Sequence, residues 1–317
     1  MANKTPPPPT SPSAFPLSRF KFQLSSSPHM SMTTSQSPDQ QWTAVVTPKK
    51  PLFDIPFREL WRYRDLVYQF VRRDLVTQHK QTVLGPIWFF VQPIVSSVVM
   101  TIIFGKIANL PTNEIPKFLF YLSGVTIWYY FSAVLSKTSN TFSGNAHLFT
   151  KIYFPRLSVP IAQSLVAMWH FFIQFLIFFG FYLYFLFSGY PIEASYRVII
   201  IPFLILQTAM LGMGCGCLIS ALTTRFKDLQ LAVAPGIQLW MYASCVFFPR
   251  SMVPPEYQWV MVLNPVVSIV EAFRFAMMGK GDVEIWQWLI SVGITLVLFF
   301  LGVIEFGRAE KNFADTI

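Results

Sequence analysis

The sequence is poor in charged residues. Only 12% of its 317 residues are Asp, Glu, Lys or Arg, and the 15 acidic residues are outnumbered by 24 basic ones. A soluble domain carries charge on about a quarter of its residues, so this shortage excludes an ordinary soluble protein. Hydrophobic residues make up 53% of the chain and gather in runs long enough to cross a bilayer. Together these features predict an all-α integral membrane protein.

Sequence motifs for nucleotide, metal and hydrolytic chemistry are missing. The chain contains no GxxxxGKS/T loop to cradle phosphates, no HExxH and no GxSxG. Of its three cysteines, Cys215 and Cys217 would point about 200° apart on a helix, and neither has a His or a further Cys nearby in sequence. We therefore expect no catalytic residue, no metal site and no cofactor in this chain, and no nucleic acid as a partner.

The sequence also offers no energy source for transport. The apolar runs lack the Asp, Glu or Lys at mid-membrane depth that proton- and sodium-coupled transporters use. A membrane protein with neither a coupling charge nor a nucleotide site is expected to depend on a partner that supplies energy.

The chain divides into four predicted parts. Residues 1–51 hold ten of the 24 prolines and many serines, which predicts a disordered head. Residues 52–83 alternate apolar residues at helical spacing with arginines, as in an amphipathic helix that lies in a membrane interface. Residues 84–306 form the membrane domain, and residues 307–317 form a cytoplasmic tail.

Six apolar runs predict six transmembrane helices, because each run provides about the 20 residues that a bilayer requires, and the third is longer and could tilt. They cover residues 84–108, 118–136, 159–187, 198–222, 231–253 and 286–306. Before the last run, the stretch "NPVVSIVEAFRFAMMG" is helical in pattern but too short to cross, which predicts a re-entrant or interfacial hairpin. Within it, Glu271 and Arg274 are three residues apart and are expected to pair.

Basic residues are distributed unequally between the two sides of the membrane. With six spans, 18 of the 24 Lys and Arg residues fall on the side of the N-terminus. Because basic residues accumulate on the cytoplasmic side, both termini are expected in the cytoplasm.

Several motifs resemble one protein family. They are "RRDLVTQHKQTVLGPIWFFVQP" at 72–93, "KIYFPRLSVP" at 151–160, "RFKDLQ" at 225–230, "NPVVSIVEAFR" at 264–274 and the tail "FGRAEKNFADTI". In this order and spacing they resemble the permease subunit of type-2 ABC polysaccharide exporters, which handle O-antigen, capsule or teichoic acid. The resemblance covers residues 52–317. Val266 is a conservative departure, because members often have Met there.

The resemblance implies a homodimer in the bacterial inner membrane, with ATP and Mg bound on a separate cytoplasmic ABC ATPase subunit. The expected substrate is a glycan linked to polyprenyl pyrophosphate. A teichoic acid or small-molecule exporter of the same fold is an alternative, and a membrane glycosyltransferase, which would act without an ATPase, is a more distant one. The resemblance also places one cytoplasmic loop beside the ATPase, and the predicted coupling residues in it are Lys151, Tyr153, Phe154, Pro155 and Arg156.

The basic end of the amphipathic helix is a candidate site for the pyrophosphate headgroup. Arg72, Arg73 and Lys80 would meet it at the cytoplasmic interface, where guanidinium groups suit phosphate. Attraction of these residues to anionic lipid is the alternative.

Aromatic residues at mid-membrane depth are a candidate sugar path. Trp128, Tyr129, Tyr130 and Phe131 lie about 15 Å along a helix from Phe118, too deep for an interfacial belt. Four consecutive positions cannot share one face, so one or two of these rings are expected to stack on sugars while the others pack. Four rings of the fifth span are candidates for the same wall: Trp240, Tyr242, Phe247 and Phe248. Trp88, Phe89 and Phe90 are expected to form an interfacial belt.

Overall fold

The structure is a computed structural model that describes residues 57–80, 87–149, 154–192, 196–281 and 283–315. All of these belong to one compact unit, Lys50–Ile317. The predicted head, and Lys151 and Tyr153 of the predicted coupling loop, lie outside the described residues.

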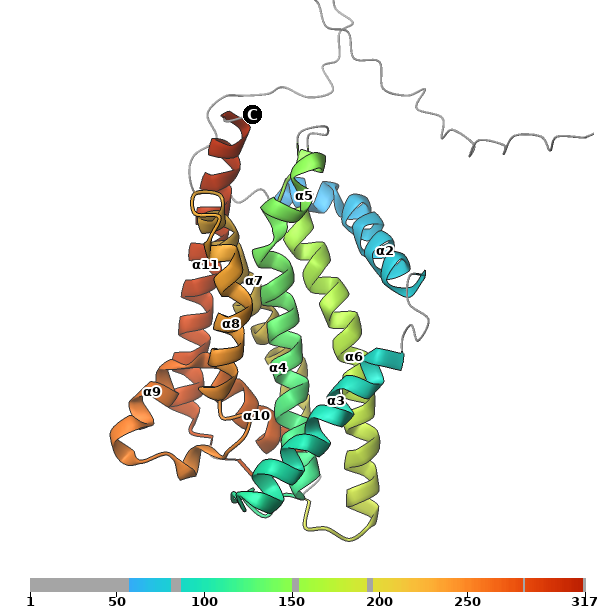
Figure 1. The fold of residues 1–317 in the computed structure, drawn as a ribbon, viewed down its shortest axis with the longest axis vertical. Helices are drawn as coiled ribbons and strands as arrows, with labels where there is room; N and C mark the ends of the chain where they lie inside the picture. Colours follow the sequence, from blue (N-terminus) through green and yellow to red (C-terminus); the bar gives the residue numbers. More distant parts are fainter. Residues whose placement is uncertain (1–56, 81–86, 150–153, 193–195, 282, 316–317) are drawn as a thin grey trace, which may run out of the picture. The chain divides into compact units, whose positions relative to one another are not determined.

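The described residues form helices and connecting turns, as the composition predicts (Figure 1). In chain order the elements are α1 (Phe57–Arg62), α2 (Arg64–Lys80), α3 (Ile87–Met100), η1 (Thr101–Ile107), α4 (Lys117–Ser139), α5 (Thr141–Phe149), α6 (Ser158–Phe187), η2 (Tyr196–Ile200), α7 (Ile201–Thr223), α8 (Leu229–Tyr242), η3 (Arg250–Met252), η4 (Pro255–Tyr257), α9 (Gln258–Leu263), α10 (Pro265–Met278) and α11 (Ile285–Asp315).

Five helical segments are long and apolar enough to cross a membrane. They are Ile87–Ile107, Lys117–Ser139, Ser158–Phe187, Tyr196–Thr223 and Ile285–Glu310. Each matches a predicted span within a few residues. The segments Pro255–Leu263 and Pro265–Met278 would add a sixth if counted as one span bent by 93°.

Helix α4 forms the centre of the bundle, between α6 and α7 (Figure 1). In its most apolar 18-residue stretch 78% of the residues are buried, against 11% for the stretch Ile87–Ile107. Helix α11 packs on the other side of α7. Glycines allow this close contact: a Cβ on Gly302 of α11 would lie 2.1 Å from the carbonyl oxygen of Gly214 in α7. Small residues of this kind are the usual means by which membrane helices approach one another.

The predicted fifth span, 231–253, is wrong as a continuous helix. Helix α8 ends at Tyr242 after 14 residues, or about 21 Å, and a non-helical segment follows. In this segment Cys245 has a left-handed backbone (φ 52°), and the prolines at 249, 254 and 255 withhold backbone donors. The hydrogen bonds that a helix would have made are replaced by bonds from side chains, described below.

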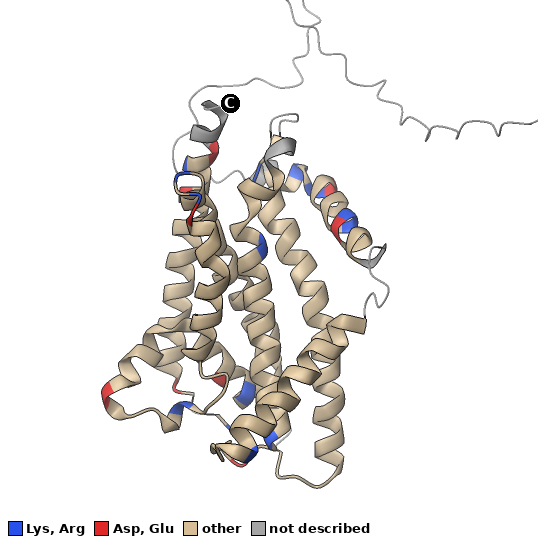
Figure 2. Cartoon of the chain, viewed as in Figure 1, with Lys and Arg blue, Asp and Glu red and all other residues tan. Residues whose placement is uncertain are grey.

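Charged residues lie mainly at the two ends of the bundle (Figure 2). One end, here the α2 end, contains α2, α5, the loop between α7 and α8, and the last turns of α11. There Arg156 donates to the backbone carbonyl of Glu310 at 3.0 Å, and Gln230 donates to Asn140 at 2.7 Å. The opposite, α10 end contains η1, α9 and α10, and Lys280 pairs there with Glu114.

Helix α2 lies against α6 at the α2 end. Its Val67 is buried, and Tyr63, Leu66 and Phe70 pack against the core, while Arg64 is exposed. One face of α2 is therefore apolar and covered by the bundle. Its placement in a membrane interface stays a prediction.

Candidate functional site

A wide groove, lined by both apolar and polar side chains, opens beside α4 toward the α2 end. Its volume is about 670 Å³, within the range of sites that bind a small molecule or a headgroup. Five helices contribute to it. The lining residues are Thr77 and Gln78 of α2; Trp88, Phe89 and Gln92 of α3; Tyr129, Ser132, Ala133, Ser136 and Lys137 of α4; His170 and Gln174 of α6; and Ala234 and Ile237 of α8.

The polar wall of the groove results from helical spacing. On α4 the lining positions recur every three or four residues, from Tyr129 to Lys137, so they share one face. On α6, His170 and Gln174 are four residues apart and point the same way. The spacing therefore brings the polar groups of α4 and α6 that line the groove together on its two walls.

The groove carries one basic side chain and no acidic one among its lining residues. Lys137 stands in the last turn of α4, and its Nζ is buried without a hydrogen-bond partner in the described part of the chain. Asp74 of α2, which does not line the groove, is close enough to act on Lys137 electrostatically. One carboxylate oxygen of Asp74 already accepts a hydrogen bond from Arg73 at 2.9 Å. The groove therefore favours anions.

Aromatic rings form one edge of the groove. The Tyr129 hydroxyl and Ser96 of α3 share a hydrogen bond of 2.6 Å, which fixes the tyrosine ring at the opening. Phe89 stacks on His170 with ring centres 4.1 Å apart, and Trp88 is half exposed. The predicted belt residues Trp88 and Phe89 thus border the groove.

Of the four rings in the predicted sugar path, Tyr129 lines the groove and the other three are buried in helix packing. Trp128 contacts Phe131 at 5.4 Å, and Tyr130 contacts Phe171 of α6 at 4.8 Å. Phe131 meets Trp240 of α8 edge to face at 5.0 Å. A sugar-stacking role stays a prediction, and within one copy of the chain Tyr129 is the ring placed for it.

The rings expected from the fifth span lie in different surroundings. Trp240 donates from its indole nitrogen to Asn264 at 3.1 Å, and Phe247 is buried against Phe104. Tyr242 is half exposed and its ring centre lies 5.3 Å from that of Phe247, while Phe248 is partly buried. Helix α8 ends between the first two rings and the last two, and their role in a sugar path stays a prediction.

The side chain of Arg274 holds the segment after α8 in place. It is completely buried and donates to the carbonyl oxygens of Cys245 at 3.0 Å and Val246 at 3.1 Å. It also pairs with Glu271 at 2.9 Å and lies 3.7 Å from the ring centre of Phe120 in α4. The predicted pair Glu271–Arg274 is therefore present, inside the protein and with further partners.

Asn264 provides a second set of side-chain bonds to the same segment. Its amide nitrogen donates to the Ala243 carbonyl at 2.9 Å and to the Ser244 hydroxyl at 3.1 Å. Its oxygen accepts from the backbone of Val266 and so caps α10. Non-helical backbone at membrane depth requires such partners, since lipid offers none.

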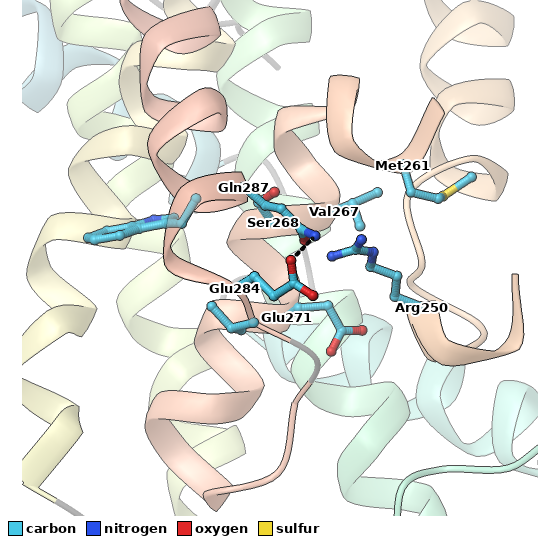
Figure 3. Close-up of a pocket in the computed structure, with 9 residues that line it drawn as sticks. Arg250, Met261, Val267, Ser268, Glu271, Glu284 and Gln287 are labelled. Carbon is cyan, nitrogen blue, oxygen red and sulfur yellow. Dashed lines mark hydrogen bonds between the residues drawn. The ribbon is translucent and has the colours of Figure 1, made fainter. Parts of the chain in front are cut away.

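A small second cavity adjoins this network (Figure 3). Arg250 and Glu284 extend into it from opposite sides, and Gln287 donates to Glu284 at 2.7 Å. Its volume of about 10 Å³ holds no more than one water molecule. It is a polar contact between α10, α11 and the loop that contains Arg250, and it is too small to bind a substrate.

Comparison with known proteins identifies the family. Residues 65–278 match the ABC-2 type transporter family. The chain belongs to this family. It is 24% identical over 255 residues to the O-antigen export system permease protein RfbA of Klebsiella pneumoniae, which covers 80% of this chain and 95% of that protein. RfbA of Myxococcus xanthus is 25% identical over 264 residues (82% and 98%), and the polysialic acid transport protein KpsM of Escherichia coli is 22% identical over 242 residues (75% and 91%).

This ABC-2 family member is a multi-pass membrane protein, as its apolar helices and its permease relatives agree. Its family relationship confirms the resemblance inferred from the motifs at 72–93, 151–160 and 264–274. It also implies partnership with an ABC ATPase subunit.

Arg72 and Arg73, two of the three basic residues predicted to meet a headgroup, are not among the residues that line the groove. Arg72 and Arg73 are exposed, Arg73 lies over the ring of Phe70 at 5.1 Å, and the side chain of Lys80 lies outside the described residues. Their role stays a prediction.

The described coupling residues of this ABC-2 protein make contacts within the chain. Phe154 is buried, with ring centres 5.6 Å from Phe70 of α2 and 5.7 Å from Phe149 of α5. Arg156 packs over Phe149 and binds the backbone of Glu310 in α11. Pro155 lies between them. A coupling role stays a prediction, and these contacts join α2, α5 and α11 at one point.

Sequence reasoning missed most of the groove. The sequence analysis singled out neither Lys137 nor His170 as a candidate site residue. The sequence did contain a signal. His170 and Gln174 are four residues apart in an otherwise apolar span, and Tyr129, Ser132 and Ser136 recur at helical spacing in another. Polar residues that share one face of a membrane helix point to protein or water, not to lipid.

Proposed function

We propose that this chain is the transmembrane permease of an ATP-driven exporter that moves a lipid-linked polysaccharide of the O-antigen type across a bacterial inner membrane. The glycan is attached to polyprenyl pyrophosphate. ATP and Mg bind to a separate cytoplasmic ABC ATPase subunit, and two copies of the permease form the path.

The groove beside α4 is the observation that carries this proposal. Its amide, hydroxyl and imidazole groups suit the hydroxyls of a sugar or the oxygens of a headgroup, and Tyr129 and Trp88 offer faces for sugar C–H groups. A strictly apolar cargo would not need so many polar groups. The named relatives that export O-antigen and polysialic acid support the same class of substrate.

The orientation with both termini in the cytoplasm follows from charge. The excess of Lys and Arg, 18 of 24, falls on the side that carries α2, the loop with Arg225 and Lys227, and the tail. In this orientation the groove opens toward the cytoplasmic half of the membrane, where a newly made polymer arrives.

A second copy of the chain is proposed to complete the path. Within one copy, α8 buries only Met241, while Leu231, Leu239 and Tyr242 are exposed. The stretch Ile87–Ile107 is also almost entirely unburied. Two copies that face each other through α3 and α8 would enclose a path that a single copy leaves open.

Transport by the reconstituted complex tests the proposal. The chain, purified with the ABC ATPase that accompanies it, is placed in liposomes and supplied with O-antigen linked to polyprenyl pyrophosphate. We expect ATP-dependent appearance of the glycan on the opposite side. Ser136→Trp, which fills the groove, should abolish transport while the complex still assembles, and Phe172→Trp on the exposed side of α6 should not.

Other outcomes would select another function. Movement of teichoic acid or a small molecule in place of O-antigen would keep the exporter and change the substrate. Sugar transfer without any ATPase would replace the exporter by a glycosyltransferase.

A further inference from the structure

The ammonium group of Lys137 is the unusual feature of the groove. It is buried, it lies in the wall of a large cavity, and no described residue accepts a hydrogen bond from it. An ammonium carries three N–H donors and a full charge, and burial without acceptors is unfavourable. A lysine that only marks the cytoplasmic side of a membrane would extend toward water instead.

The protein compensates this charge only in part. Asp74 acts on Lys137 electrostatically but makes no hydrogen bond to it, and Arg73 holds the Asp74 carboxylate. None of the 14 residues that line the groove is acidic. Among the described residues, the charge of Lys137 is therefore balanced only in part and its N–H groups have no acceptor.

The surroundings favour an anion that is attached to a lipid tail. The groove lies between membrane helices, and the adjoining face of α3 is apolar and exposed, with Trp88, Val95 and Val98 at least two-fifths exposed. A tail can lie along this face while the headgroup enters the groove. Ser132 and Ser136 share the face of α4 with Lys137 and offer hydroxyl donors to phosphate oxygens.

We infer that Lys137 binds the diphosphate of the polyprenyl carrier when the headgroup occupies the groove, and that Asp74 holds the place of this anion when the groove is empty. The inference rests on the proposed function and identifies the residue that recognises its substrate. It predicts opposite effects for the two residues: loss of the Lys137 charge weakens binding, and loss of the Asp74 charge strengthens it.

Equilibrium binding of undecaprenyl diphosphate to the full chain in phosphatidylcholine nanodiscs tests the inference without transport. Lys137→Gln should weaken binding about tenfold or more, because charge-assisted hydrogen bonds to phosphate are lost. Lys137→Arg should stay within a few-fold of the parent, and Asp74→Asn should bind more tightly. Lys227→Gln is the matched control, since Lys227 is an exposed basic residue at the same end. Equal affinity of Lys137→Gln and the parent would overturn the inference.

Competing ligands separate the possible sources of phosphate. Undecaprenol, which has no phosphate, should not compete, and phosphatidylglycerol should compete only at large excess. If inorganic pyrophosphate binds as tightly as undecaprenyl diphosphate, the site takes a free anion and the lipid assignment is wrong. If phosphatidylglycerol competes one for one, the site takes an ordinary phospholipid and the carrier assignment is wrong.

The site and the proposed function can fail separately. Binding that depends on Lys137 in a complex that moves no polysaccharide would keep the site and remove the exporter. ATP-driven export by a Lys137→Gln complex at the parental rate and affinity would keep the exporter and remove the site. Lys137→Gln buries no new charge, and Lys137→Arg provides a second variant that retains the charge, which separates misfolding from loss of the site.

Discussion

Gly124 of α4 leaves the space that the guanidinium of Arg274 occupies. A Cβ at Gly124 would lie 2.9 Å from Nη2 of Arg274 and 3.1 Å from the Val246 carbonyl oxygen. A helix position without a side chain, a buried guanidinium and a carbonyl of the non-helical segment after α8 thus meet at one point. Each of the three depends on the other two.

Removal of the Arg274 guanidinium should destabilise the fold. Arg274→Gln leaves Glu271 charged and buried and removes the bonds that the guanidinium donates to the carbonyls of Cys245 and Val246, a loss of about 3–5 kcal/mol for a broken buried pair. The melting temperature in detergent reports it. Arg250→Gln, a change of the same type in the loop between α8 and α9, is the control, and its melting temperature should be close to that of the parent.

Exchange of the two charges distinguishes a simple pair from the wider network. We expect the double variant Glu271→Arg with Arg274→Glu to remain as unstable as Arg274→Gln. The guanidinium of an arginine at position 271 would not reach the carbonyls of Cys245 and Val246. Restoration of the parental melting temperature by the exchange would show that only the pair of charges matters.

Glycines at the contact of α7 and α11 should be irreplaceable. Gly302→Ala places a Cβ 2.1 Å from the Gly214 carbonyl oxygen, so the helices must separate. Gly293→Ala, also in α11, meets nothing within 4 Å. We expect the first variant to lose folded protein in size-exclusion chromatography and the second to equal or exceed the parent, since alanine favours the helix. Equal yields would mean that the two helices are not in contact.

The two neighbouring rings Trp128 and Tyr129 should respond differently to substitution. Trp128→Leu removes a buried ring and should cost a few kcal/mol of stability. Tyr129→Leu faces the groove and should leave stability nearly unchanged while lowering export per folded complex, and Tyr129→Phe should retain much of the export. Full export by Tyr129→Leu would assign this ring to packing.

Loss of the Phe154 ring should separate α2 from the bundle. In Phe154→Ala the contacts with Phe70 and Phe149 disappear, so we expect faster amide hydrogen exchange in α2 and weaker export, with normal membrane insertion. Arg156→Glu, which reverses the charge beside Glu310, should act in the same direction on ATPase binding or export. Unchanged export and exchange in both variants would remove this loop from coupling.

Acid should weaken the contact between Glu114 and Lys280 at the α10 end. The hydrogen bond and charge of Lys280 hold the pKa of the Glu114 carboxyl below its usual value of 4.5. The contribution is therefore present above the ordinary pKa and is lost as the pH falls through the lowered one. Because Glu114 is fully exposed, the effect is small and screened by salt.

Comparison of Glu114→Gln with the parent measures this contribution. The difference in melting temperature should be largest near about pH 7 and should disappear as the pH falls below the lowered pKa of Glu114, where the parental carboxyl is also neutral. A difference that persists in acid would have another cause.

Hydropathy located five of the spans because every helix that crosses a bilayer needs about 20 consecutive, mostly apolar residues. The predicted run 118–136 lies within α4, and 159–187 nearly coincides with α6. Hydropathy could not locate the end of α8, since the residues from Ala243 to Val246 are as apolar as a helix would be. What ends the helix is a set of donors from Asn264 and Arg274, which lie 20 or more residues away.

The groove could be predicted only in part, for a similar reason. The residues His170 and Gln174 were visible as a polar pair on one helix face. That this face meets Tyr129 and Lys137 depends on how α4 and α6 pack, which no local pattern in either helix contains. The same packing buries Trp128 and Tyr130, whose sequence context is indistinguishable from that of Tyr129.

The bonds of Arg274 and Asn264 also determine how α8 can move. Its far end is attached to α4 and α10 through side chains, so the end near Tyr242 keeps its position when the rest of the helix tilts. The near end, at Leu229, is exposed and has Gln230 as its polar contact with α4. A force applied at the loop between α7 and α8 would therefore swing the near end through a wide arc about a stationary far end. The groove, which Ala234 and Ile237 border, would widen or narrow without any change in the length of the helix.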